Sequence, residues 1–199
     1  MVASDRGQAL TFEGVIAGIL LLAAIGFALQ VTAVTPLSPS TSSQHVENQL
    51  QATGEGVLTS SAQTGALEET ILYWDAEAEE GRFHGAGDAT FYRSGPPDTS
   101  FGDELSAVLG SRNVAYNVYI HYQTAEDVVQ TQQLLSQGRP SDHAVSFSRS
   151  VTLLDSDHLV LEDGSEGQRL DAVDFYMPDA STDDTVYNLA RVEVVAWRI

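Results

Sequence analysis

The 199-residue chain contains no cysteine and no lysine. Its nine basic residues are all arginines, set against 28 aspartates and glutamates, which gives a formal net charge of −19. Without cysteine the chain can form neither a disulfide framework nor a thiolate metal site. Without lysine it cannot form a Schiff base with a carbonyl substrate. The small number of cations also excludes binding of nucleic acid through a basic surface, because phosphate neutralisation requires clustered positive charge.

Motifs for catalysis and metal binding are missing as well. The chain has no Gly-x-Ser-x-Gly elbow, no phosphate-binding loop and no Ser-x-x-Lys sequence. Its histidines do not have the spacing of a metal motif, and they are His45, His84, His121, His143 and His158. We therefore expect no enzymatic activity, no catalytic residue, no metal site and no cofactor. Calcium binding is the alternative at two clusters of carboxylates, although neither has the regular calcium-loop sequence. The first cluster contains Asp155, Asp157, Glu162, Asp163 and Glu166, and the second contains Asp179, Asp183 and Asp184.

The sequence does contain one long apolar segment near its start. Residues 14–34 carry no charge, and as a helix they would be about 31 Å long, roughly the thickness of a bilayer's hydrocarbon core. Pro36 and Pro39 then end the helical pattern. This predicts a transmembrane helix at residues 14–35, preceded by a cytoplasmic segment at residues 1–13. A cleaved secretory signal and a plain single-pass anchor are the alternatives.

The negative charge is concentrated after this segment. Residues 1–35 hold two acids and one arginine, so of the total of −19 only −1 lies there and residues 36–199 carry −18. An acidic domain does not favour the anionic inner leaflet of a membrane. We therefore expect a single-pass protein of the cell membrane with an extracellular head at residues 36–199.

Within the head, the hydrophobic period changes from helical to alternating. A capping-box sequence at residues 41–44 begins an amphipathic pattern that continues to about residue 61. Residues 114–122 and 145–153 alternate with a period of two, as strands do. The last run, residues 186–199, has apolar side chains on both faces and so predicts a central strand. The expected fold is α+β: the transmembrane helix, a further amphipathic helix, and an antiparallel β-sheet.

The residues just before the apolar segment resemble the class III signal of archaeal type IV pilins. Arg6-Gly7 resembles the recognition pair of the processing signal, Gln8 the first residue after the cut, and Glu13 the acidic residue near the new amino terminus. The resemblance implies that a prepilin peptidase cuts on the cytoplasmic side and that the helix is retained in a filament core. A cut after Gly7 makes Glu13 the sixth residue of the mature chain, and a cut after Gln8 makes it the fifth.

The residues around Glu13 suit assembly through a helix bundle. A carboxylate at this position can neutralise an amino terminus in a low-dielectric environment, either its own or that of a neighbour. The spacing Gly14-x-x-x-Gly18 allows close approach of helices. Glu13, Gly14 and Gly18 are therefore the candidate assembly residues.

The whole chain resembles a family of haloarchaeal type IV pilin-like proteins. The resemblance lies in residues 34–38, 42–45, 47–49 and 72–74 and in the last strand. An acidic, arginine-only composition fits molar salt, where the Debye length is about 3 Å. The resemblance implies a minor subunit of a cell-surface pilus, with the membrane, a prepilin peptidase, other pilin subunits and the pilus assembly platform as partners. The alternative is a permanently membrane-anchored surface protein whose head binds a ligand or partner.

Overall fold

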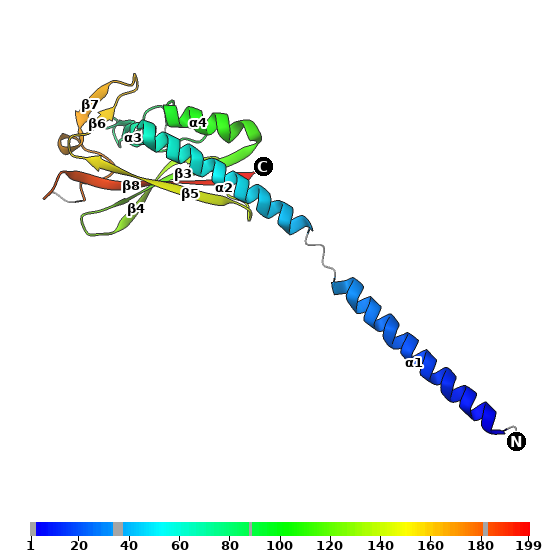
Figure 1. The fold of residues 1–199 in the computed structure, drawn as a ribbon. Coiled ribbons are helices and arrows are strands. Elements are labelled where there is room, and N and C mark those ends of the chain that lie inside the picture. The colour runs from blue at the N-terminus through cyan, green and yellow to red at the C-terminus, as the bar shows by residue number, and fades with distance from the viewer. Residues whose placement is uncertain (1–2, 34–37, 88, 181–182) are drawn as a thin grey trace. The chain divides into compact units, whose positions relative to one another are not determined.

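The computed structural model describes residues 3–33, 38–87, 89–180 and 183–199. Side chains are described for residues 12–27 and from residue 44 onward within those ranges. The chain divides into two compact units, Met1–Gln44 and His45–Ile199, and the second is called the head below. Figure 1 shows the elements of each unit.

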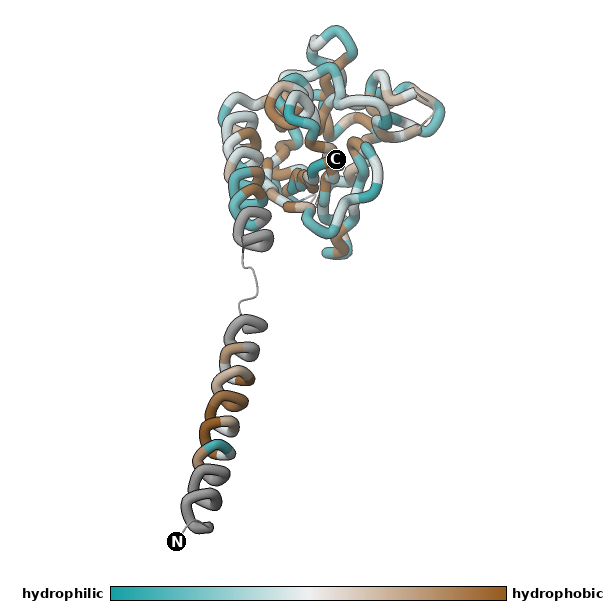
Figure 2. Tube along the Cα trace, turned by 90° about the vertical axis from the view of Figure 1, so that its right-hand side faces the viewer, coloured by the Kyte–Doolittle hydropathy of each residue, from teal (hydrophilic) through white to brown (hydrophobic). Residues whose placement is uncertain are grey.

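The first unit contains α1, a single helix at Ala3–Ala33. Its sequence is rich in Ala and Leu and contains no proline, so its residues strongly favour a helix. Residues 14–27 are all apolar or glycine, so apolar residues lie all around the axis there, and Figure 2 colours most of this described part as hydrophobic. A helix that is apolar all round requires apolar groups to cover its whole surface.

The prediction of a transmembrane helix at residues 14–35 is wrong. Among the residues that the structure describes, no helix is both long and apolar enough to cross a membrane. Side chains 28–35 of the predicted span lie outside the described residues.

The head is an α+β domain built on an antiparallel sheet. Its principal sheet has the strand order β4-β3-β8-β5, and the helices cover one face of it (Figure 1). The helices are α2 (Ser38–Thr64, which begins in the first unit), α3 (Ala66–Leu72) and α4 (Ser100–Val108), with short 3-10 turns η1 (Gly110–Arg112) and η2 (Leu170–Ala172). The strands are β1 (Trp74–Asp75), β2 (Arg82–Phe83), β3 (Val114–Gln123), β4 (Val129–Ser136), β5 (Val145–Leu154), β6 (His158–Val160), β7 (Glu166–Arg169) and β8 (Val186–Arg198).

Strand β8 is central, as its apolar residues on both faces predict. It pairs with β3 on one side and with β5 on the other. Val192, Val194 and Ala196 alternate along it and are at most 1% exposed, because they lie against the helices in the core. Leu189 lies on the other face of the sheet and is 51% exposed.

Helix α2 packs closely on the sheet at Gly54. A Cβ atom added to Gly54 would lie 2.1 Å from Cζ of Phe147 on β5, and Phe147 is itself buried at 4% exposure. The same atom added to Gly56, also on α2, would meet nothing within 4 Å. Glycine is therefore required at one of these positions and not at the other.

This difference predicts opposite effects for two alanine substitutions on one helix. Gly54→Ala should destabilise the head by about 1–2 kcal/mol, since overpacking against Phe147 exceeds the gain in helix propensity. Gly56→Ala should stabilise it by up to about 1 kcal/mol, because only the propensity changes. Urea unfolding followed by circular dichroism measures both. Equal midpoints for the two variants would contradict the close packing of α2 on β5.

Candidate functional site

The predicted processing residues lie on the backbone of α1. Arg6, Gly7 and Gln8 are helical, but their side chains lie outside the described residues. The cleavage bond therefore stays a prediction, after either Gly7 or Gln8.

The three predicted assembly residues lie on the described, exposed part of α1. Glu13 is exposed beside Ile16 and Leu20, which together with Phe12 and Ala17 form an apolar concavity along the helix. Gly14 and Gly18 lie one turn apart, and a Cβ atom added to either would meet nothing within 4 Å. The structure thus places a single carboxylate and two open glycine positions in an apolar helix surface.

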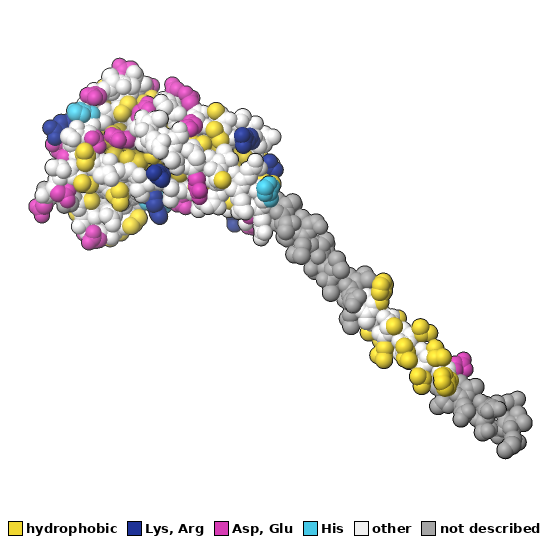
Figure 3. Space-filling model, in the orientation of Figure 1, with side chains coloured by type: hydrophobic (Ala, Val, Ile, Leu, Met, Phe, Trp, Pro, Cys, Tyr) yellow, Lys and Arg dark blue, Asp and Glu magenta, His cyan; other side chains and the backbone are white. Residues whose placement is uncertain are grey.

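The apolar side chains around these residues are exposed in the described part of α1. Their exposed fractions run from 49% at Ile25 to 73% at Phe12. Figure 3 shows these hydrophobic side chains along the described part of α1, whereas acidic side chains are spread over the visible face of the head. The large exposed residues are Phe12, Val15, Ile16, Ile19, Leu20, Leu21, Leu22, Ile25 and Phe27. So many exposed apolar side chains together indicate a surface that another apolar surface covers.

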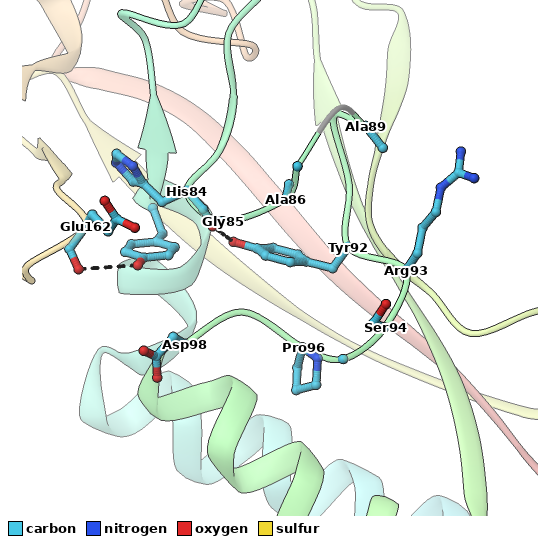
Figure 4. A pocket seen from close by; sticks show the side chains of 13 residues that line it. His84, Gly85, Ala86, Ala89, Tyr92, Arg93, Ser94, Pro96, Asp98 and Glu162 are labelled. Atoms are coloured by element: carbon cyan, nitrogen blue, oxygen red, sulfur yellow. Dashed lines mark hydrogen bonds between the residues drawn. The ribbon is translucent and has the colours of Figure 1, made fainter.

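The head contains an open pocket that the sequence did not predict. Its volume is about 940 Å³, and its walls come from the end of α3, the loop after β2, the segment before α4 and the turn after β6. The loop sequence contains several glycines and two prolines, which are typical of an irregular segment but do not predict a cavity. The lining residues are Tyr73, His84, Gly85, Ala86, Gly87, Ala89, Tyr92, Arg93, Ser94, Gly95, Pro96, Asp98 and Glu162 (Figure 4).

Tyr92 fixes the pocket loop to the sheet. Its backbone N–H donates to the carbonyl of Leu134 at 2.8 Å, and its carbonyl accepts from the N–H of Ser136 at 2.9 Å, both on β4. Its hydroxyl donates to the carbonyl of His84. Burial, followed by the nearby Tyr73 and Asp98, raises the pKa of the Tyr92 phenol well above its usual range. The phenol therefore stays neutral and keeps its proton for the bond to His84.

Tyr73 and His84 form the inner wall of the pocket. Their ring centroids are 4.9 Å apart, and the Tyr73 hydroxyl lies 3.4 Å from the carbonyl oxygen of Glu162, to which it donates. Burial raises the pKa of the Tyr73 phenol, and the charges of Glu162, Asp98 and Glu69 raise it further. The Nε2 atom of His84 is buried and has no hydrogen-bond partner among the described residues. The inner wall is therefore aromatic and lies in a negative field.

The other predicted candidates give no further site in the described part of the chain. His121 lies on β3 at the sheet surface. Its Nε2 is 2.8 Å from Oε2 of Glu193, and its Nδ1 is 2.9 Å from Oγ1 of Thr131. His143 lies 3.1 Å from Glu47. Within the described ranges, no group of three or more histidine or acidic side chains is placed to hold a metal ion. The carboxylate clusters considered for Ca²⁺ thus have no metal-binding arrangement there.

Comparison with known proteins gives one family. Residues 6–196 match the model of a family of unknown function (DUF7288). No curated protein matches the chain, and no solved structure matches it.

Proposed function

The chain belongs to DUF7288, a family of unknown function, and we propose from its own residues that it is a type IV pilin-like subunit. Copies assemble into a surface filament through α1, and the acidic head is displayed outside the filament core. The carrying observation is the exposed apolar surface around α1 at residues 12–27. Other pilin subunits, an assembly platform and a prepilin peptidase are the proposed partners.

The energetics of α1 support assembly. Covering a large apolar side chain is worth about 1.5–3 kcal/mol relative to leaving it in water. Nine such side chains are exposed on the described part of α1, so covering them contributes on the order of 10 kcal/mol even when much is lost to ordering. The open surfaces at Gly14 and Gly18 let a neighbouring helix approach closely.

Glu13 supports a processed amino terminus in the same assembly. A carboxylate covered by apolar helices is costly without a positive partner. The other charged residues near the start are Asp5 and Arg6, and a cut after Gly7 or Gln8 removes both. The free α-amino group that the cut creates is then the partner of Glu13.

Single cysteines introduced into the cysteine-free chain test the proposal. Ile19→Cys should give disulfide-linked dimers in protein oxidised within the producing cells, because the proposed assembly brings the α1 surfaces of neighbouring copies together at Ile19. Leu189→Cys is the matched control, since Leu189 is similarly exposed but lies on the head. Equal cross-linking of both variants, or none at Ile19, would contradict assembly through α1. Intact mass of the same protein reports processing: a mature chain beginning at Gln8 or Ala9 is expected, and one beginning at Met1 or Val2 would contradict the cut.

The pocket in the head favours a second function, a surface protein that binds a ligand. It has a volume of about 940 Å³ and lies away from the assembly residues in sequence. This function predicts an uncut amino terminus and no effect of Glu13→Gln. A subunit that both assembles and binds would instead show the Ile19 cross-link together with ligand binding.

A further inference from the structure

We propose that the head pocket binds a small organic cation that presents a guanidinium or primary ammonium group. The pocket's volume of about 940 Å³ lies at the upper end of the range of small-molecule sites. Its walls come from four separate stretches of the head, and Tyr92 anchors one of them to β4. The proposal concerns the head alone and does not depend on assembly through α1.

The charges around the pocket favour a cation. Asp98 and Glu162 both line the pocket. Their negative charges, and that of Glu69, help to raise the pKa of the Tyr73 phenol. Arg93 is the basic residue in the described lining, and its guanidinium carbon lies 5.0 Å from the ring centroid of Phe91. Figure 4 shows Glu162, His84 and Asp98 toward one end of the pocket and Arg93 at the other, with its guanidinium extending away. An anion at the end with Asp98 and Glu162 would therefore meet two carboxylates, with the guanidinium of Arg93 at the other end.

The uncharged groups at the same end are suited to an N–H donor. The rings of Tyr73 and His84, whose centroids are 4.9 Å apart, form the wall there. The backbone at Gly85, Gly87 and Gly95 is open, because a Cβ atom on each would meet nothing within 4 Å. A planar guanidinium suits the pocket because it can donate paired hydrogen bonds to a carboxylate and lie against an aromatic ring.

The same residues do not suit a metal ion. Calcium requires six to eight oxygens at about 2.3–2.6 Å, and no such group of acidic side chains occurs among the described residues. The two carboxylates come from segments before α4 and after β6 and flank an aromatic wall. A ligand large enough to contact both, with a stem beside Tyr73 and Tyr92, fits the pocket better than a bare ion.

Titration of the full-length chain with two matched probes tests this proposal. Nα-acetylarginine methylamide carries the cation, and the corresponding citrulline compound has nearly the same shape without the charge. We expect the arginine compound to bind at least about tenfold more tightly, as charge-assisted hydrogen bonds are worth more than neutral ones. Isothermal titration calorimetry measures both affinities. Equal affinities, or no heat of binding from the arginine compound, would overturn the proposal.

Substitutions of the two carboxylates locate the site. Asp98→Asn with Glu162→Gln should reduce the affinity for the arginine compound to that of the citrulline compound, since shape is kept and charge is lost. Glu126→Gln, at an exposed turn position between β3 and β4, should leave the affinity unchanged, and circular dichroism confirms that each variant is folded. Undiminished binding by the folded double variant would place the cation elsewhere. The Ile19 cross-link is independent of all these outcomes, so the two proposals fail separately.

Discussion

Leu20→Asp is expected to abolish assembly of the chain while the head stays folded. Leu20 lies among the apolar side chains of α1 and is 64% exposed within one copy. Covering an aspartate by neighbouring apolar helices costs several kcal/mol unless it is neutralised or paired, which reduces association by a hundredfold or more. Sedimentation of protein extracted from the producing cells measures the loss as a shift from large assemblies to single copies.

A matched control separates this effect from a general effect of added charge. Leu189→Asp places the same group at a similarly exposed apolar position, 51% exposed on the head. An exposed substitution away from a contact changes stability by about 0.5 kcal/mol or less, so assembly should persist. Sedimentation of Leu20→Asp as large assemblies, like the control, would contradict a filament core built from α1.

The sequence predicts those parts of the fold that a local period determines. The alternation in residues 114–122 and 145–153 corresponds to β3 and β5, and the doubly apolar run at 186–199 to β8 in the sheet centre. Arg149 interrupts the apolar face of β5 without disrupting it, because β5 is an edge strand of its sheet and this side chain is exposed. A charged residue is tolerated at such an edge.

Strand β4 was not predicted, for the opposite reason. Its sequence, Val129–Ser136, has four consecutive polar residues, and its first three residues are exposed. Leu134 and Leu135 are its only buried members. Pairing with β3 and the attachment of Tyr92 determine its conformation, and neither contact leaves a local pattern in the sequence.

The pocket could not be predicted because its residues come together only in the folded head. Glu162 is far from Tyr73 in sequence, yet the hydroxyl of Tyr73 donates to its carbonyl. The glycines and prolines of residues 85–97 predict a loop, but the cavity beside that loop depends on its attachment to β4 at Tyr92. The assembly residues are different, since Glu13, Gly14 and Gly18 are neighbours along one helix and their shared surface follows from the sequence.

The transmembrane prediction was wrong because an apolar sequence pattern does not identify the surroundings of a helix. It relied on the length of an uncharged apolar run, but among the described residues no helix is long and apolar enough to cross a membrane. Apolar residues around a helix indicate that it requires cover but do not identify what covers it. The same exposed residues support the proposed packing between copies.

Asn188→Ala is expected to be the most destabilising single substitution in the sheet. Asn188 is completely buried on β8. Its Nδ2 donates to the carbonyls of Gln123 and Pro178, each at 2.8 Å, and its Oδ1 accepts from the N–H of Gln123 at 3.2 Å. Alanine leaves three backbone groups without this partner, at about 1–3 kcal/mol for each that water does not reach. A loss of roughly 3–5 kcal/mol follows, measured by urea unfolding.

The size of this effect follows from the position of Asn188 in the sheet. The pairing of β3 with β8 ends at His121, two residues before Gln123, and the pairing of β5 with β8 shifts register beside Asn188. Backbone groups there lack ladder partners, and the amide of Asn188 replaces them, as buried backbone groups require. Asn48→Ala, an exposed position on α2, is the control and should change stability by at most about 0.5 kcal/mol. If the two variants unfold at the same urea concentration, the amide does not hold the end of β3 to β8.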